Sequence, residues 1–199
     1  MCIYTDKLTW IPLILSLLFV LFRKNWKEAL LVCVAIALTI TLCDQFASTL
    51  CKPYFARFRP AQDPDFSPFV QIVNGYRGGR YGFISSHAAN SFGAVVLLSL
   101  IFRNRLFTIT AILWAIINCY SRIYLGVHYP GDILCGTIAG IIIAYIIYMM
   151  WKKSRNLLLK KKILIDEQSP YQEDSDIKIA TAVIYLSILV IGGYAFIAA

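Results

Sequence analysis

Charged residues are scarce in this sequence. Asp, Glu, Lys and Arg make up 15% of the 199 residues, whereas 59% are hydrophobic, and the mean hydropathy is +0.66. Soluble domains are typically about a quarter charged and about half apolar. The shortage of charge therefore argues against a cytosolic globular protein and favours helices in a bilayer. We expect residues 1–199 to form a single membrane-embedded domain.

Patterns typical of metal, redox and secreted proteins are missing. The six cysteines show no CxxC or other metal-ligand spacing, and most of them lie inside apolar runs, so we interpret them as small buried hydrophobic residues. The acidic residues form no cluster that could hold two metal ions, and the chain has only two histidines. We therefore expect no metal and no cofactor. The beginning of the sequence lacks the basic stretch and cleavage site of a signal peptide.

The net charge of +8 does not indicate a nucleic-acid partner. Many of the 19 Lys and Arg residues fall in short tracts between long apolar runs, as in the loops of a membrane protein. The partner that this distribution favours is the bilayer itself, and we expect no binding of nucleic acid.

Six apolar stretches are candidates for membrane-spanning helices, so the predicted fold class is all-α, an integral membrane bundle of about six transmembrane helices. The stretches are Leu8–Phe22, Ala29–Cys51, Ile84–Phe102, Leu106–Tyr120, Ile133–Trp151 and Ile179–Ala199. About 20 residues cross the hydrocarbon core, so the third, fifth and sixth are convincing alone, whereas the first and fourth depend on their neighbours. The runs are continuously apolar rather than alternating, which disfavours spanning strands.

Basic residues predict the orientation of the bundle. Lys and Arg follow the first and third spans and fill the tail from Lys152 to Lys162, and an excess of basic residues in short loops marks the cytoplasmic side. The other side receives Thr5–Lys7, the loop Lys52–Gly82 and the link Ser121–Asp132, and we expect it to face the periplasm or cell exterior from a bacterial inner (plasma) membrane. The charged segment Lys152–Lys178 is interpreted as a surface connection.

The first polar segment at the outer end of a span contains Lys52 and Arg59. Ionisable residues at membrane depth are costly and are kept mostly where they have a function. Pro53 and Pro60 interrupt helices, so we expect the second span to end near Cys51 and the cations to follow it. Interfacial anchoring beside aromatic residues is the alternative interpretation of these cations.

Two further polar segments begin the third and fifth spans. Ser85 or Ser86 is a natural N-cap, the free N–H groups of that helical turn form an anion site, and His87 lies on the same turn. In the third segment, Asp132 is expected to be the N-cap of the fifth span and to accept the Nδ1–H of His128, which would leave Nε2 unprotonated and nucleophilic. Plain helix caps and an interfacial histidine are the alternatives.

Together the segments contain three cations, which are Lys52, Arg59 and Arg122 of the third segment, a helix N-terminus, one histidine oriented by a carboxylate and one spare histidine. Phosphoryl transfer needs positive charge around the phosphate oxygens, a nucleophile in line and an acid for the leaving oxygen. These residues supply all three, so the sequence favours phosphate chemistry that requires no metal.

These residues resemble the type 2 phosphatidic acid phosphatase (PAP2) family, which shares its catalytic core with vanadium haloperoxidases. The family pattern is Lys-x6-Arg-Pro, then Pro-Ser-Gly-His, then Ser-Arg-x5-His-x3-Asp. The residues that fit are Lys52, Arg59 and Pro60 in the first motif, Ser85 and His87 in the second, and Ser121, Arg122, His128 and Asp132 in the third. Ile84 and Ser86 replace the Pro and Gly of the second motif. The resemblance covers a catalytic core of about residues 29–151.

The resemblance implies a role for each matching residue. His128 would attack phosphorus to give a phosphohistidine, Asp132 would orient it, and His87 would protonate the leaving group. The phosphate-binding residues would be Lys52, Arg59 and Arg122, assisted by Ser85 and the N–H of Ser86. A serine at position 86 still carries this N–H, so we expect activity to survive the change from Gly.

The leading hypothesis is an integral-membrane lipid phosphatase that hydrolyses a phosphomonoester or pyrophosphate. An undecaprenyl pyrophosphate-type lipid is the first expectation for the substrate; lipid A phosphate, phosphatidylglycerol phosphate and phosphatidate are the alternatives. A transporter or a non-catalytic phospholipid binder would use the same cations for binding alone. Asp44, deep in the second span, is expected to hydrogen-bond a neighbouring helix. It lies about two helical turns from Lys52, too far for a direct contact unless the helix end bends.

Overall fold

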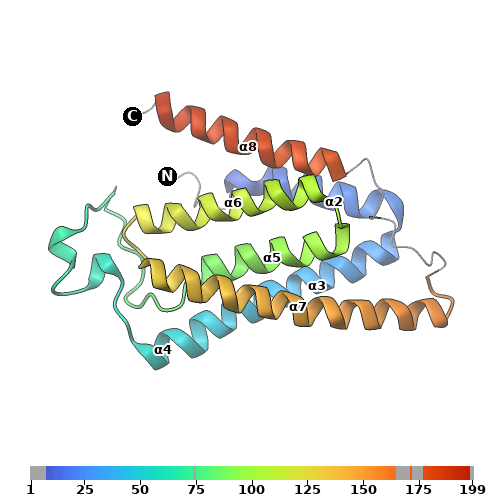
Figure 1. Ribbon diagram of the computed structural model, residues 1–199, viewed down its shortest axis with the longest axis horizontal. Helices are drawn as coiled ribbons and strands as arrows, with labels where there is room; N and C mark the ends of the chain where they lie inside the picture. Colours follow the sequence, from blue (N-terminus) through green and yellow to red (C-terminus); the bar gives the residue numbers. More distant parts are fainter. Residues whose placement is uncertain (1–7, 74, 165–170, 172–176, 198–199) are drawn as a thin grey trace.

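The computed structural model describes residues 8–73, 75–164, 171 and 177–197, and this part of the chain is helical (Figure 1). Its long helices are α2 (Ile11–Lys24), α3 (Trp26–Gln45), α5 (Ser86–Phe102), α6 (Arg105–Tyr124), α7 (Pro130–Lys160) and α8 (Ile177–Ile197). Short elements are the π-helix η2 (Phe46–Cys51), α4 (Lys52–Phe55) and the 3₁₀ turns η1 (Leu8–Trp10), η3 (Pro60–Gln62) and η4 (Ser67–Phe69). The six long helices correspond to the six expected spans, and the predicted all-α class is confirmed.

Within the described residues, three continuous helical segments are long and apolar enough to cross a bilayer: Trp26–Phe55, Arg105–Tyr124 and Pro130–Lys160. The other apolar stretches whose side chains the structure describes, Ile11–Arg23, Ser86–Phe102 and Ile177–Gly193, are shorter, and α5 has 17 residues. This changes the ranking expected from the sequence: the fourth span is convincing alone, whereas the described parts of the third and sixth are shorter than these three segments. The 17-residue helix α5 extends about 26 Å, close to the thickness of the hydrocarbon core.

Polar side chains define where several helices begin. The side chain of Asn25 accepts the backbone N–H groups of Lys27 and Glu28 at the start of α3, and Asn104 accepts that of Phe107 in α6. Between α5 and α6, Arg103 adopts a left-handed φ of 51°, which ends α5. These caps explain how very short turns join α2 to α3 and α5 to α6.

Two helix ends differ from the expectation. The helix that contains the second span continues through Pro53 to Phe55, where Ala56 turns it with a φ of 46°. The prediction of an end near Cys51 was wrong because the preceding π-helix Phe46–Cys51 widens the backbone in which the proline ring must fit. At the other end of the bundle, α7 continues to Lys160, so the first part of the expected surface connection is helical.

Helices α3, α5 and α7 pack against one another through glycines. Gly136 and Gly140 of α7 lie one turn apart, and a Cβ on either would overlap the backbone oxygen of Ser85 or Ala89 in α5. Gly93 of α5 lies close to side chains of α3, since a Cβ there would be 3.1 Å from Cys43 Sγ and from Thr39 Cγ2. Small residues spaced four apart allow helix backbones in membranes to approach closely. This contact brings the N-terminal ends of α5 and α7 together.

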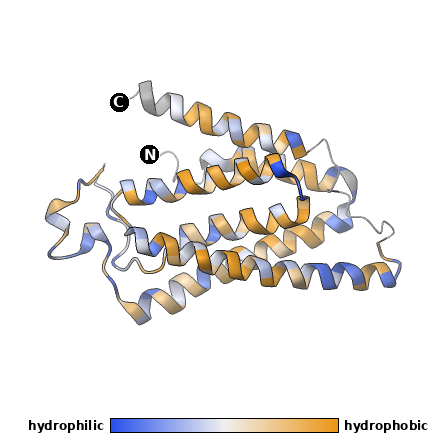
Figure 2. Ribbon diagram, viewed as in Figure 1, coloured by the Kyte–Doolittle hydropathy of each residue, from blue (hydrophilic) through white to orange (hydrophobic). Residues whose placement is uncertain are grey.

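The bundle has a buried apolar interior and a largely apolar outer surface. Val20, Leu97 and Phe102 are completely buried, yet large apolar side chains such as Leu134 and Val190 are 62% and 69% exposed. Figure 2 shows that hydrophobic residues dominate the long helices, whereas hydrophilic residues are concentrated toward the ends. An exposed apolar band of this extent is typical of a surface that meets lipid.

The two ends of the bundle differ in content. The loop between α4 and α5, the end of α6 and the start of α7 lie at one end, and the turns α2–α3 and α5–α6 lie at the other (Figure 1). This matches the expected grouping of loops. Thr5–Lys7, Ala199 and much of the segment before Lys178 lie outside the described residues.

We expect Gly140→Ala to destabilise the protein, because the added methyl group would force α5 and α7 apart. Overpacking of this kind lowers the free energy of unfolding by about 1–3 kcal/mol. The thermal midpoint of the detergent-solubilised protein measures the effect. Gly192→Ala is the matched control, since nothing lies within 4 Å of a Cβ at Gly192. Equal midpoints for the two variants would contradict the close helix contact.

Candidate active site

The three polar segments meet where α5 and α7 begin. The backbone N–H of Ser85 donates to the backbone oxygen of Asp132 at 3.0 Å, which ties the second segment to the third. The backbone of Gly82 packs over both other segments, since a Cβ there would lie 3.1 Å from Arg59 Cγ and 3.2 Å from Asp132 Oδ2. Residues far apart in sequence therefore form one cluster at one end of the bundle.

His128 is almost completely enclosed, with 2% of its surface exposed. Its Nδ1 lies 3.5 Å from Oδ2 of Asp132, at the limit of hydrogen-bond length, and has no closer partner among the described residues. Burial lowers the pKa of the His128 imidazole to about 4, and a smaller effect of the Asp132 carboxylate opposes this shift. The ring is therefore neutral at pH 7, the state that a nitrogen nucleophile requires.

Asp132 is fully buried and has more partners than the sequence indicated. Its Oδ2 accepts the backbone N–H of Tyr129 at 2.9 Å, and its Oδ1 accepts NH1 of Arg57 at 3.2 Å. The expectation that Asp132 is the N-cap was wrong: Tyr129 is the N-cap, and Asp132 occupies the third helical position, from which its carboxylate reaches back to the cap.

Arg57 is the residue of this cluster that the sequence analysis left out. Its guanidinium lies 4.4 Å from the centre of the Tyr129 ring as well as on Asp132. Nothing in the sequence separates it from Arg77 and Arg80, which lie between Lys52 and Gly82 as Arg57 does. The structure places these two elsewhere: Arg77 donates to the backbone oxygen of Ala61, and Arg80 lies over Phe58 and Tyr81.

His87 lies on the first turn of α5 and, unlike His128, is exposed. It is within electrostatic range of Arg122, His128, Arg59 and Lys52. The two imidazoles thus belong to one site, with one ring enclosed and the other open to an incoming group. Their roles as nucleophile and acid remain predictions from the family pattern.

Arg59 and Arg122 differ in which of their N–H donors have partners in the protein. Arg59 is 9% exposed and donates from Nε to the backbone oxygen of Tyr81 at 3.1 Å. Arg122 is 2% exposed; its NH2 donates to the Tyr76 hydroxyl at 3.3 Å, whereas its buried Nε has no partner in the described part of the chain. A buried guanidinium N–H without a partner is costly, and an anion in the site would supply one.

The two serines of the second segment have different surroundings. Ser85 is the N-cap of α5, as the sequence allowed, and its fully buried hydroxyl accepts the N–H of Ala88 at 3.3 Å. The hydroxyl of Ser86 accepts Nζ of Lys52 at 2.9 Å. The N-terminus of α5 therefore points its free N–H groups toward the side of the bundle where the cations gather.

The loop between α4 and α5 folds over this end of the bundle. Its two arms pair through an isolated β-bridge between Phe58 and Tyr81, and Ala61 N donates to Gly126 O at 2.9 Å. Tyr76 contacts Arg122, so the loop covers part of the site. Phe69, by contrast, is 82% exposed.

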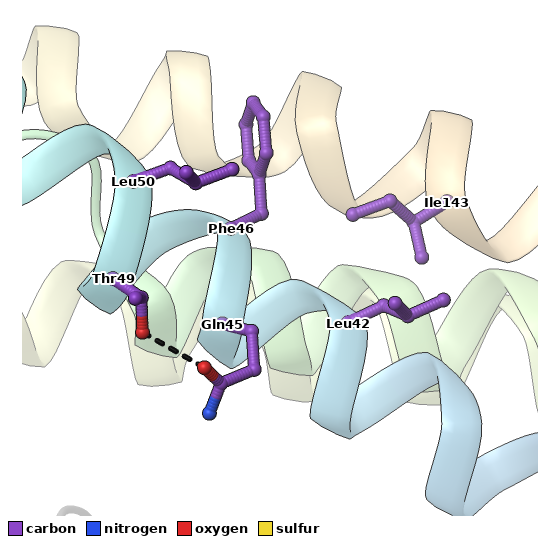
Figure 3. A pocket seen from close by; sticks show the side chains of 6 residues that line it. All are labelled: Leu42, Gln45, Phe46, Thr49, Leu50 and Ile143. Carbon is purple, nitrogen blue, oxygen red and sulfur yellow. Dashed lines mark hydrogen bonds between the residues drawn. The ribbon is translucent and has the colours of Figure 1, made fainter.

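Two further features bear on the location of the chemistry. Within the described residues, no three His, Cys, Asp or Glu side chains gather as metal ligands. An apolar groove on the outer face of α3, η2 and α7 is lined by Leu42, Gln45, Phe46, Thr49, Leu50 and Ile143 (Figure 3). None of these side chains is charged or titrates near neutral pH, and none belongs to the cluster of imidazoles and cations.

An all-helical membrane bundle with imidazoles and cations at one end defines a class of membrane phosphate-transfer enzymes. The model of the PAP2 superfamily matches residues 28–156, and the chain belongs to this superfamily. The protein is an integral-membrane phosphoric ester hydrolase that acts on lipids.

Curated relatives are lipid phosphatases. The chain is 41% identical over 172 residues to the lipid A 4'-phosphatase of Porphyromonas gingivalis, covering 85% of this chain and 72% of the relative. It is 39% identical over 195 residues to the lipid A 4'-phosphatase of Bacteroides thetaiotaomicron, covering 97% and 84%. The undecaprenyl-diphosphatase of Sulfolobus acidocaldarius is 26% identical over 144 residues, covering 72% and 64%. No solved structure matches the chain.

The lowered pKa of His128 predicts a pH-dependent stability. Between the ordinary histidine pKa of about 6.5 and the folded value of about 4, the unfolded chain binds a proton that the folded protein excludes, so this contribution to stability is present above pH 6.5 and declines as the pH falls toward 4. We expect the thermal midpoint of His128→Gln to fall less than that of the wild type over this interval. Parallel pH profiles would contradict a buried neutral imidazole.

Proposed function

We propose that this lipid phosphatase removes a phosphate group from a lipid A-type lipid by way of a phosphohistidine on His128. The observation that carries the proposal is the pairing of a buried, neutral imidazole with a buried guanidinium, Arg122, whose Nε has no partner among the described residues. A phosphate bound between these groups would accept the Nε–H of Arg122 and present its phosphorus to the imidazole.

The proposed reaction follows from the chemistry of the groups. Nε2 of His128 attacks phosphorus, a P–N bond forms as the ester P–O bond breaks, and His87 donates its proton to the leaving alkoxide. His87 then takes a proton from water, which attacks phosphorus, breaks the P–N bond and releases inorganic phosphate. Lys52, Arg59 and Arg122 neutralise the charge on the phosphate oxygens throughout, with the N-terminus of α5 beside them.

The relatives favour a lipid A-type substrate over the polyprenyl pyrophosphate that the sequence alone suggested first. Both relatives near 40% identity are named lipid A 4'-phosphatases, whereas the undecaprenyl-diphosphatase is 26% identical. This supports the alternative among the sequence-based hypotheses. A phosphate monoester also needs only one phosphate-binding cluster, and the described residues provide one.

The site is proposed to face the periplasm or cell exterior. The opposite end of the bundle carries the exposed basic residues Lys152 and Lys153, and the positive-inside rule assigns such residues to the cytoplasm. The substrate would then enter from the outer leaflet, with its phosphate at the level of the helix N-termini.

Phosphate release from a panel of lipids tests the proposed activity. We expect the detergent-purified protein to release phosphate from a lipid A 4'-phosphate faster than from undecaprenyl pyrophosphate or phosphatidate, and His128→Ala to reduce the rate by about 10³-fold or more. Turnover should persist in EDTA and be inhibited by vanadate. Lys153→Ala, at the far end of the bundle, is the control.

The outcomes separate the hypotheses. Full inhibition by EDTA or unchanged turnover in His128→Ala would contradict the mechanism. Faster release from the pyrophosphate would restore the first substrate hypothesis. Binding of the lipids without release of phosphate would instead indicate a transporter or a phospholipid-binding protein.

Cysteine labelling tests the orientation. In a cysteine-free background, a membrane-impermeant maleimide added outside is expected to label Phe69→Cys, since Phe69 lies in the loop at the site end and is strongly exposed. Lys160→Cys, at the end of α7, should react only after the membrane is permeabilised. The reverse pattern would place the site on the cytoplasmic side.

A further inference from the structure

Lys52 is held in place by a chain of polar side chains along its own helix. Nζ of Lys52 donates to the hydroxyl of Ser48 at 3.1 Å, and this hydroxyl donates to Oδ1 of Asp44 at 3.4 Å. Asp44 was expected to hydrogen-bond a neighbouring helix; its described contact is within its own helix instead. Ser48 therefore links the Lys52 ammonium to the Asp44 carboxylate.

The π-helix explains why these three residues share one face. Asp44, Ser48 and Lys52 recur every fourth residue, and each such step in an α-helix passes a full turn by about 40°, so the first and third would diverge by about 80°. In the π-helix the N–H of Lys52 bonds to the backbone oxygen of Ala47, five residues back. The wider turn reduces the divergence and aligns the chain Asp44–Ser48–Lys52.

The far end of this chain reaches the phosphate site. Nζ of Lys52 also donates to the hydroxyl of Ser86, in the first turn of α5, at 2.9 Å. An ammonium group has three N–H donors, and two of them are bound by Ser48 and Ser86 within the described residues. The third donor stays available for an oxygen of a bound phosphate.

The charge of Asp44 adds an electrostatic attraction on Lys52 to these hydrogen bonds. A carboxylate within a membrane-spanning helix is costly and is retained when it pairs with another charge. Lys52 lies within electrostatic range of Arg59 and Arg122, which repel it, and of Asp44, which attracts it. The flexible stem of lysine would otherwise let Nζ move away from the two arginines toward the interface.

We propose that Asp44 is a positioning residue that, through Ser48, holds the Lys52 ammonium against Ser86 and ready for the substrate phosphate. This inference rests on the proposed function, because it assigns Lys52 to the phosphate. A second effect opposes it: loss of the Asp44 charge alone would strengthen the binding of any anion. Asp44 lies behind Ser48 and Lys52, farther from the phosphate than Lys52 itself. We therefore expect the loss of positioning to outweigh the loss of repulsion between Asp44 and the anion.

The test is the affinity of the detergent-purified full-length protein for vanadate, measured by inhibition and by direct binding. We expect Asp44→Asn, which keeps an acceptor for Ser48 and loses the charge, to weaken vanadate binding by about tenfold, and Ser48→Ala to do the same. Asp44→Glu restores the charge and should recover most of the affinity. Thr49→Val is the matched control, because the Thr49–Gln45 hydrogen bond has the same spacing and faces the outer groove (Figure 3).

A double-mutant cycle separates positioning from a merely structural role. In the Lys52→Ala background, Asp44→Asn is expected to cause no further loss of vanadate affinity, since the group that Asp44 positions is gone. An equal loss in both backgrounds, or no loss in the wild-type background, would overturn the positioning role. Wild-type release of phosphate from lipid is measured alongside, so a failure of the proposed function is seen separately. Thermal midpoints of all variants identify any that fail to fold.

Discussion

The close approach of α5 and α7 is the contact on which the site depends. Gly136 and Gly140 allow α7 to lie against the backbone of α5, and the Ser85 N–H then reaches the backbone oxygen of Asp132. Side chains larger than hydrogen at these positions would separate the two helix N-termini. Because one N-terminus carries His87 and the other follows His128, the spacing of the helices sets the spacing of the imidazoles.

The cluster combines a neutral imidazole with positively charged guanidinium groups. Enclosure keeps His128 neutral, while Arg59 and Arg122 are held nearby by backbone oxygens and a tyrosine hydroxyl rather than by carboxylates. Asp132 is shared among Arg57, Tyr129 and His128, so its charge is partly used before it acts on the imidazole. The positive charge of the cluster is therefore left largely uncompensated, as an anion-binding site requires.

Much of the site could be read from the sequence because its residues lie in three short motifs at the ends of apolar runs. Lys52, Arg59, Arg122, His87, His128 and Asp132 all belong to the cluster that the structure assembles. Arg57 could not be singled out, because its value comes from contacts with Asp132 and Tyr129, 75 and 72 positions away. Asp44 was likewise misjudged, since α-helical spacing cannot reveal a π-helix.

The sequence by itself determined the all-helical membrane class, the six apolar segments and the residue types of the site, because hydropathy, proline and capping preferences act over a few residues. The tertiary structure decided the helix ends at Phe55 and Lys160, the cap at Tyr129 and the partners of each charge. These depend on which backbones come into contact, and glycine-mediated packing between α5 and α7 joins residues about 50 positions apart that no local pattern connects.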